Sequence, residues 1–448
     1  MKLKYFNKNG ILPGIITTVG VSLCFSSAAK AITKEKPNFI IIFTDDQGYN
    51  DLGCFGSKTI KTPRIDKMAQ EGLKMTCFYA QPVSGPSRGV LMTGRYPVRI
   101  GGGWIVNPDE IMIPEVLKAQ GYKTGCIGKW DMSQRKLLKG CIPNDQGFDY
   151  YFGTLGATDR GVIQLCRNRD TLNWTNEMSS LTGLYTDEAI KFIKDNKDAP
   201  FFLYLAHSMP HVKIDASAKF KGKSAGELYG DVIEEIDWNV GRILDLVKEL
   251  GLDKNTYILY ASDNGPWSGL ESSFRAAHGG QLATGSAFPL RSGKGSAYEG
   301  GFREPCIFWA PGRIPSGRVN NGMMSTLDIL PTFAKLAGAK VPDDRIIDGF
   351  DQSALLTGKT DKSAREIFFY HVKGEVHAVR QGKWKLLLPN RTLFFPYTND
   401  PPITTPELYD LENDISEKTN LAGKYPQIVS RLLDLAKKAP EDLNLFTL

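Results

Sequence analysis

The chain has 448 residues, of which 42% are hydrophobic and 23% are charged. That much apolar material excludes intrinsic disorder as the main state, and the length predicts two or three domains. The 55 Lys and Arg residues exceed the 49 Asp and Glu residues, giving a formal net charge of +6 and suggesting an acidic partner such as a nucleic acid, a membrane surface or a sulfated or phosphorylated polymer.

Residues 1–31 predict a cleaved export signal. They begin with basic residues, continue through an uncharged apolar run at 11–25, and end in an A-x-A pattern at Ala31. The apolar run is shorter than the roughly 20 residues of a membrane helix, so we expect an exported protein, periplasmic or secreted, with no membrane span. Cys24 opens the alternative of a lipid anchor, but Leu23 before it fits such processing poorly.

The charge balance changes when this segment is removed. Residues 1–31 contain four lysines and no acidic residue, so the remaining chain has 51 basic and 49 acidic residues. Most of the apparent basicity therefore belongs to the export signal, and we expect no nucleic-acid partner. A local anionic group remains the favoured ligand.

Three apolar runs along the chain read as buried strands, at residues 38–44, 201–206 and 256–262. Each is followed at once by polar residues: Asp45 and Asp46, then His207 and His211, then Asp263 and Asn264. Helical patterns such as residues 230–250 lie between them, which indicates an α/β domain. Because ligands gather at the carboxyl ends of strands in such sheets, the three endings predict one shared site.

The later part of the chain changes character. Residues 265–301 form a long polar stretch, a kind of loop that is usually functional or disordered. We place an α/β domain at 32–354 and a smaller α+β domain at 355–448. Within the latter, residues 378–388 predict a hairpin and residues 425–439 a final helix.

The segment from Ser84 to Arg95 reads S-G-P-S-R followed by L-M-T-G-R. Pro86 suits the first turn of a helix, which would place Ser84 at the N-cap. A simple helix cap is the plainest interpretation of this serine. The positive end of a helix dipole would nevertheless favour bound or developing negative charge there.

This segment resembles the signature of the type I, formylglycine-dependent sulfatases, in which C/S-x-P-S-R is followed by T-G-R. Further landmarks of the family follow in the same order over residues 37–440: Thr44–Gly53, Gly128–Trp130, Pro210–His211, Asp263–Gly265, Leu290–Lys294 and Glu299–Pro305. The resemblance implies an alkaline-phosphatase-like fold, with a central mixed β-sheet flanked by helices, and a short antiparallel sheet plus helix in the C-terminal domain.

The residues expected to bind metal offer oxygen ligands only. Asp45, Asp46, Asp263 and Asn264 suit a hard cation, Ca²⁺ in preference to Mg²⁺, rather than Zn²⁺. A solvated turn would be the ordinary explanation of Asp45-Asp46 alone, but the second strand ending in Asp-Asn favours a site. The resemblance adds the modified residue 84 to these ligands.

The resemblance also implies the chemistry. Ser84 would be converted to formylglycine by a radical S-adenosylmethionine maturing enzyme, and the hydrated aldehyde would attack the sulfur of a sulfate ester. Arg88 and Lys129 would add positive charge around the anion. His211, with Lys294, would donate a proton to the leaving alcohol, and these two residues together with Lys129 would bind the substrate.

One position departs from the family pattern. Where G-K-W-H is usual, this chain has Gly128-Lys129-Trp130-Asp131. A carboxylate can also accept a proton, so our hypothesis is that Asp131 replaces the usual histidine as a base.

Substrate specificity is expected from the loops around the site. His278 is the favoured candidate for substrate binding because its Ala- and Gly-rich surroundings offer no core, while Arg275, Trp267 and Trp104 are weaker candidates. The leading hypothesis is a sulfatase (EC 3.1.6.-) acting on a sulfated carbohydrate. The alternatives are a phosphodiesterase or phosphonate hydrolase of the same fold, and a weakly active protein that binds sulfated glycans.

Maturation gives the first testable prediction. Conversion of Ser84 to formylglycine removes two hydrogens, so peptide mass spectrometry should find a loss of about 2 Da at residue 84 after co-expression with the maturing enzyme. Protein made without that enzyme is the control and should keep the serine mass and lack activity. An active protein with unmodified Ser84 would contradict the prediction.

Overall fold

The computed structural model describes residues 36–102, 104–267, 285–389, 397–398 and 400–441. The predicted export signal, Arg275 and His278 therefore lie outside the described residues. Residues 36–448 belong to one compact unit. Among the described residues, no helix combines the length and apolar character needed to cross a membrane.

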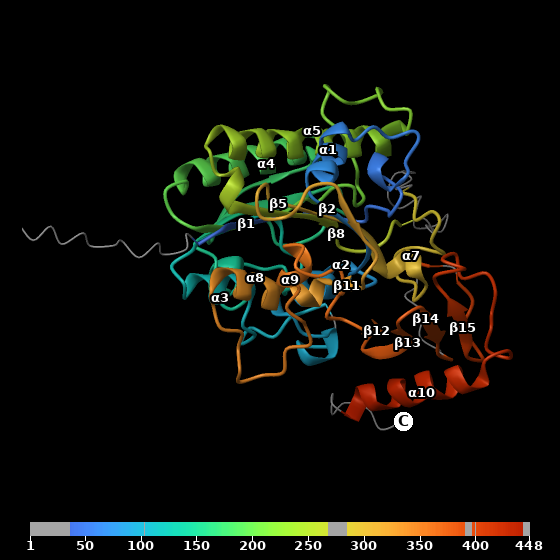
Figure 1. The fold of residues 1–448 in the computed structure, drawn as a ribbon. Coiled ribbons are helices and arrows are strands. Elements are labelled where there is room, and N and C mark those ends of the chain that lie inside the picture. The colour runs from blue at the N-terminus through green and yellow to red at the C-terminus, as the bar shows by residue number, and fades with distance from the viewer. Residues whose placement is uncertain (1–35, 103, 268–284, 390–396, 399, 442–448) are drawn as a thin grey trace, which may run out of the picture. The chain divides into compact units, whose positions relative to one another are not determined.

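A mixed β-sheet forms the centre of the molecule (Figure 1). Its eleven strands, counted over the described residues, are in spatial order β10 (Arg318–Asn320), β2 (Leu73–Tyr79), β9 (Arg303–Trp309), β8 (Thr256–Ser262), β1 (Asn38–Thr44), β7 (Phe201–Ala206), β3 (Lys123–Lys129), β4 (Tyr150–Thr154), β5 (Ile163–Arg167) and β6 (Asp170–Thr175), with β11 (Met324–Ser325) also paired to β2. The predicted α/β sheet is confirmed, and the three strands expected from sequence have the predicted bounds.

Helices cover both faces of this sheet (Figure 1). One face carries α1 (Pro63–Glu71), α4 (Leu181–Asp195) and α5 (Glu227–Glu249), and the other carries α2 (Ser84–Thr93), α3 (Ile113–Lys118), α8 (Ile329–Ala337) and α9 (Ser353–Leu356). Helix α5 begins three residues before the predicted start at 230.

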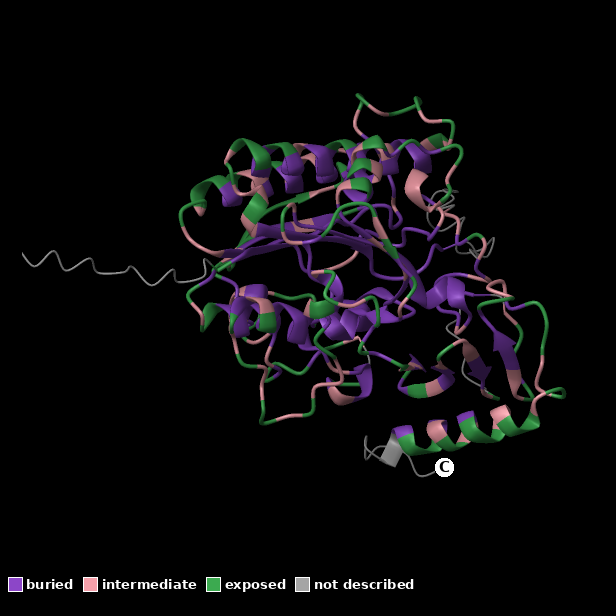
Figure 2. Ribbon diagram, viewed as in Figure 1, coloured by how far each residue is buried: buried purple, intermediate pink, exposed green. Residues whose placement is uncertain are grey.

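Strand β1 shows why both faces must be covered. Its side chains alternate between the two faces, as the pleat requires. Ile40 and Ile42 join the core under α1, α4 and α5, whereas Phe39, Ile41 and Phe43 join the core on the side of α2, α3 and α8. The buried strands in Figure 2 therefore lie between two layers of helices.

The register of the central strands brings their polar endings together. β1 is parallel to both β7 and β8, with Phe43 opposite Ala206 and Thr44 opposite Ser262. β3 continues the parallel set beside β7. The residues after β1, β7 and β8 and the last residue of β3 consequently meet at one edge of the sheet, as predicted.

The C-terminal part contains a four-stranded antiparallel sheet of β12 (Ile367–Val372), β13 (Glu375–Gln381), β14 (Trp384–Leu387) and β15 (Glu407–Asp410), followed by α10 (Pro426–Glu441). β13 and β14 form the predicted hairpin. Val379, Leu386 and Leu408 pack with Leu432 of α10, so the short sheet has its own apolar layer.

A buried ion cluster joins this sheet to the rest of the protein. Glu299 is the first residue of α7 (Glu299–Phe302), and its carboxylate accepts hydrogen bonds from Tyr79 (2.6 Å), Tyr370 (2.7 Å) and Lys385 (3.0 Å). Lys385 also lies 2.8 Å from Glu417. Burial alone would raise the pKa of Glu299, but Lys385 and nearby arginines hold that pKa well below its usual range.

This cluster should be a main support of the C-terminal sheet. We expect Lys385→Ala to lower the free energy of unfolding by about 3–5 kcal/mol, because two buried carboxylates lose their shared cation. The control is Lys383→Ala, which removes a partly exposed pair with Asp410 and should cost much less, because solvent screens such a pair. Urea unfolding followed by circular dichroism measures both values, and equal losses would show that the buried cluster has no special role.

Candidate active site

Four oxygen-bearing side chains meet where β1 and β8 end, and all four are fully buried. The backbone N–H of Asp46 donates to Oδ1 of Asp263 at 3.1 Å, and Nδ2 of Asn264 donates to Oδ1 of Asp46 at 2.6 Å. Asp45 is the residue between β1 and Asp46. The two strand endings that the sequence predicted to share a site are therefore in direct contact.

Ser84 faces this group from the start of α2. Its Oγ donates to Oδ1 of Asp45 at 2.9 Å and lies 3.3 Å from Oδ1 of Asn264. The predicted N-cap position is wrong by one residue: Val83 is the N-cap and Ser84 the first helical residue. The hydroxyl bonds to the carboxylate across the site instead of capping its own helix.

Ser87 fixes the start of α2, a role that sequence reasoning did not assign. Its hydroxyl accepts from the backbone N–H of Gln81 at 2.8 Å and also contacts the carbonyl oxygen of Asp263. One side chain thus joins the turn before α2 to the segment after β8. Its position within S-G-P-S-R was the available signal, but such a bridge depends on the fold.

Three cations balance the carboxylates. Arg88 reaches Oδ2 of Asp263 at 2.8 Å and Oδ2 of Asp45 at 3.3 Å. Lys129, the last residue of β3, lies 2.5 Å from Oδ2 of Asp45, and Lys294 lies 2.6 Å from Oδ1 of Asp46. The polar loop predicted at 265–301 therefore contributes at least one residue to the site.

These contacts set the charge states. Burial alone would raise the pKa of Asp45, but Lys129, His211 and Arg88 hold it well below the usual range. Burial and the negative charge of Asp45 raise the pKa of Asp263 above its usual value, against the opposing effect of Arg88. Burial would lower the pKa of both lysines, yet the aspartates beside them keep both pKa values above normal.

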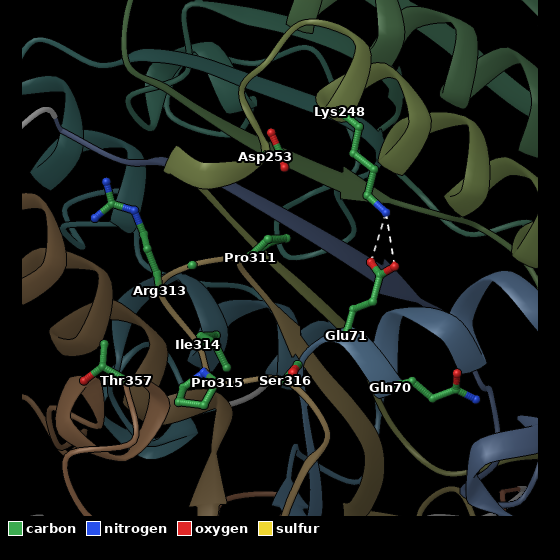
Figure 3. Close-up of a pocket in the computed structure, with 11 residues that line it drawn as sticks. Gln70, Glu71, Lys248, Asp253, Pro311, Arg313, Ile314, Pro315, Ser316 and Thr357 are labelled. Carbon is green, nitrogen blue, oxygen red and sulfur yellow. Dashed lines mark hydrogen bonds and ion pairs between the residues drawn. The ribbon is translucent and has the colours of Figure 1, made fainter.

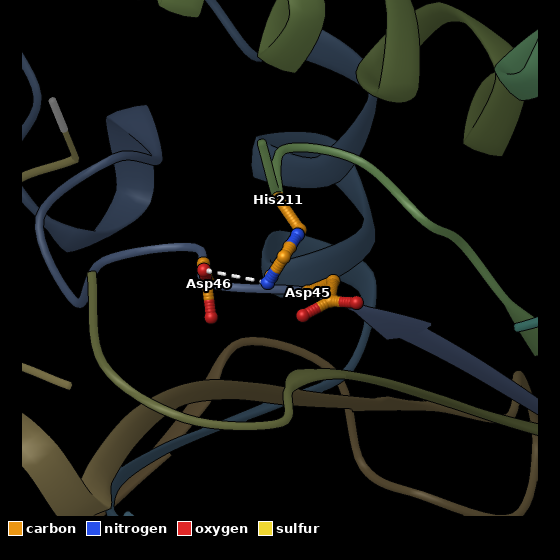
Figure 4. Close-up of side chains that lie close together, drawn as sticks. All are labelled: Asp45, Asp46 and His211. Carbon is orange, nitrogen blue, oxygen red and sulfur yellow. Dashed lines mark ion pairs between the residues drawn. The ribbon is translucent and has the colours of Figure 1, made fainter. Parts of the chain in front are cut away.

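His211 lies close to Asp45 and Asp46 (Figure 4). Its Nδ1 lies 2.6 Å from the carbonyl oxygen of Val212, so that nitrogen donates. Nε2 then lies 3.8 Å from Asp46 and 3.7 Å from Asp159. Asp45, Asp46 and His211 each offer one atom within 4.8 Å of the others, a spacing that could hold a metal ion.

His207 has none of the ring-nitrogen contacts that His211 makes. It is buried, neither ring nitrogen has a hydrogen-bond partner among the described residues, and burial lowers its pKa to about 4. Neither His207 nor His211 lies in a helix, so the two do not form a helical metal pair.

Asp131 lies between two cations. Its carboxylate is 3.1 Å from Nζ of Lys129 and 2.5 Å from Nε of Arg135, and the residue has φ 45°. Left-handed backbone of this kind is uncommon outside glycine and is tolerated best by Asn and Asp. The fold therefore places the Asp131 carboxylate between Lys129 and Arg135.

A pocket of about 920 Å³ opens onto this group. The predicted residues that line it are Ser84, Lys129, Asp131, His211 and Lys294. Trp104, predicted as a weaker candidate for substrate specificity, also lines it, as does Tyr397. Trp267 instead packs against His211 with ring centroids 5.7 Å apart and is buried.

The sequence did not point to Asp159 or Tyr397. Asp159 follows β4, a strand too short and mixed to be recognised from its pattern, and Tyr397 belongs to the C-terminal part of the chain. Only the folded chain brings these two residues to the same pocket as Ser84.

A second pocket, of about 750 Å³, is shown in Figure 3. Lys248 forms an ion pair with Glu71 there at 3.0 Å, and the loop after β9 supplies Arg313. None of the residues predicted for the site lines it. The candidate active site is therefore the pocket that contains Ser84.

The fold and this carboxylate-rich centre define a hydrolase of the alkaline-phosphatase-like class. The Sulfatase family model matches residues 37–339, and the model described as N-sulphoglucosamine sulphohydrolase, C-terminal, matches residues 293–440. The chain belongs to the sulfatase family and is a sulfuric ester hydrolase, as its sequence motifs predicted.

Individual relatives support the assignment to the sulfatase family. The chain is 33% identical to N-acetylgalactosamine-6-sulfatase of Mus musculus, with 91% of this chain and 87% of the relative covered. It is 35% identical to arylsulfatase A of Homo sapiens, with 92% and 90% covered. The Ps i-CgsB structure in complex with k-i-k-neocarrahexaose has a TM-score of 0.74 at 32% identity, covering 90% of this chain and 92% of that chain.

Proposed function

We propose that this protein is an exported sulfatase that removes sulfate from a sulfated carbohydrate, using formylglycine made from Ser84. The observation that carries the proposal is the position of the Ser84 hydroxyl, 2.9 Å from Asp45 and at the inner end of a pocket lined by Lys129, His211 and Lys294. A nucleophile, fixed cations and a candidate acid thus face the same space.

The donor set fits Ca²⁺. Oxygen atoms come together from the side chains of Asp45, Asp46, Asp263 and Asn264. The buried Oδ2 of Asp46 has no hydrogen-bond partner among the described residues. Ca²⁺ accepts many oxygen ligands in a flexible arrangement, whereas Mg²⁺ usually keeps several waters. Ca²⁺ bound there would supply positive charge to the sulfate. Formylglycine would supply a hydrated aldehyde as the nucleophile.

Each remaining residue has a role that follows from its contacts. Lys129 and Lys294 line the pocket and would bind the sulfate oxygens through charge-assisted hydrogen bonds. Arg88 is fully buried and bound to both Asp45 and Asp263, so it would position the metal ligands and contribute its charge from behind them. His211, with Nδ1 held by a backbone carbonyl, would present Nε2 to the leaving alcohol.

A carbohydrate substrate is favoured by the pocket and by the relatives. The pocket wall carries Gln134, Arg160 and Gln164, side chains that suit a hydroxylated, anionic ligand better than a sterol. N-acetylgalactosamine-6-sulfatase is named for a sulfated sugar, and a related structure contains a neocarrahexaose. Steryl-sulfatase of Homo sapiens, 33% identical, is a relative named for a different class of substrate.

Sulfate release is the decisive test. The matured protein should release sulfate from sulfated oligosaccharides and from 4-nitrophenyl sulfate, and kcat/KM for 4-nitrophenyl phosphate should be at least about 100-fold lower. Ser84→Ala, made in the same cells, is the control and should be inactive. Preference for phosphate esters would support the phosphodiesterase alternative, and glycan binding without release would support the binding-protein alternative.

Calcium binding should stabilise the fold. Adding Ca²⁺ to chelator-treated protein should raise the unfolding temperature, with a gain of about 2.7 kcal/mol at 100 times the Kd. Mg²⁺ at the same concentration should raise it less. Asp263→Asn removes one ligand charge and should abolish most of the response, whereas Asp245→Asn, in a surface pair with Arg64, should keep it. An equal response in both variants would exclude the proposed ligand set.

Asp131 is proposed as the base that replaces the usual histidine. Asp131→Asn keeps the shape of the side chain but cannot accept the proton, so kcat should fall by about 100-fold or more. Arg135→Gln removes the neighbour bound to Asp131 at 2.5 Å and controls for loss of that contact. Unchanged kcat in Asp131→Asn, or an equal fall in both variants, would show that Asp131 is not the base.

A further inference from the structure

The outer wall of the active-site pocket is formed by a hairpin at the edge of the central sheet. Strand β6 is the last strand of that sheet and pairs with β5, with Trp174 opposite Gln164. Both residues line the pocket that contains Ser84. The hairpin therefore extends the pocket away from the metal ligands.

Trp174 is unusually exposed for its size. It is 66% accessible to solvent, and among the described large hydrophobic side chains only Phe288 is more exposed. Among the described residues no aromatic ring or cation is placed against it. An indole combines a large apolar face with a polar N–H, so an exposed one that lines a pocket is suited to bind a ligand with both kinds of surface. The apolar face of a sugar ring is such a ligand.

Two basic residues of the same wall are free. Lys136 and Arg160 are exposed, and neither has an ion-pair partner among the described residues. The inner cations differ, because Lys129 and Lys294 are paired with Asp45 and Asp46. Among the described residues, the acidic side chains of this wall are Asp131 and Asp159, and Asp159 lies 3.7 Å from His211.

The pocket is larger than a single sulfate group requires. At about 920 Å³ it lies in the upper range of pockets that enclose drug-sized ligands. The inner end already has the cations required for the sulfate that is hydrolysed. The outer aromatic and basic groups are therefore available to bind another part of the substrate.

We infer that Trp174, Arg160 and Lys136 form a subsite for a second, anionic sugar residue next to the one that loses sulfate. Trp174 stacks on the sugar ring, and the two cations bind its sulfate or carboxylate group. The inference rests on the proposed function and sharpens it: the substrate is an oligosaccharide with more than one negative charge. A small aryl sulfate would use the inner end alone.

The test compares two kinds of substrate in variants of the matured enzyme. Tetrasaccharides from chondroitin sulfate, heparan sulfate and carrageenan are screened first, and the best substrate is compared with 4-methylumbelliferyl sulfate. Trp174→Ala and the double variant Arg160→Ala/Lys136→Ala should each lower kcat/KM for the tetrasaccharide by about tenfold, mainly through KM. Both should leave the aryl sulfate unchanged within about twofold.

Matched controls come from the same elements. Asn173→Ala changes the exposed neighbour of Trp174 on β6, and Lys139→Ala removes an exposed charge near Lys136; neither residue lines the pocket. Both should behave like the wild type. Raising NaCl from about 50 to about 500 mM should increase KM for the tetrasaccharide more in the wild type than in the double variant, because salt screens exposed charges.

The outcomes separate this inference from the proposed function. If the wild type releases no sulfate from any substrate, the proposed function fails. If it hydrolyses the aryl sulfate but prefers none of the tetrasaccharides, or if the subsite variants change both substrates equally, the subsite is absent although the enzyme is a sulfatase. Selective loss with the tetrasaccharide supports the subsite.

Discussion

The active site depends on one electrostatic constraint, the burial of several carboxylates at a single edge of the sheet. Asp45, Asp46 and Asp263 are all fully buried. Asp45 and Asp46 are neighbours in the chain, and the backbone N–H of Asp46 donates to Asp263. Charges removed from water in this way are strongly unfavourable unless opposite charges compensate them. Arg88, Lys129 and Lys294 provide that compensation, and they come from a helix, a strand end and a loop. The geometry of the site is thus coupled to the packing of these elements.

The inner and outer cations of the pocket differ in whether they are paired with a carboxylate. An inner lysine that already contacts an aspartate is held in place, so in the proposed function it would add charge to a sulfate without a large loss of side-chain freedom. Arg88 is fully buried and pairs with Asp45 and Asp263. Outer cations such as Arg160 have no such partner among the described residues and remain available for a ligand. The pocket is therefore ordered from a rigid, charge-balanced end to an open wall with exposed aromatic and basic groups.

Sequence reasoning worked where a pattern has a direct physical cause. Strands covered on both faces are continuous apolar runs, and three of them were predicted with correct bounds. It was less accurate at helix ends, because the first helical residue depends on hydrogen bonds that sequence does not display: Ser84 bonds to Asp45 rather than to its own helix. It also missed Asp159 and Ser87, whose roles arise from contacts between segments distant in the chain.

The sequence by itself determined the family, the α/β class and most of the residues placed around Ser84, because motif and strand signals are local and survive without coordinates. Only the tertiary structure decided which carboxylate each cation neutralises, which ring nitrogen of His211 faces the pocket, and that the hairpin carrying Trp174 forms its outer wall. Those features depend on distances between segments that can be more than 200 residues apart in the chain. Such distances are fixed by packing rather than by any local pattern.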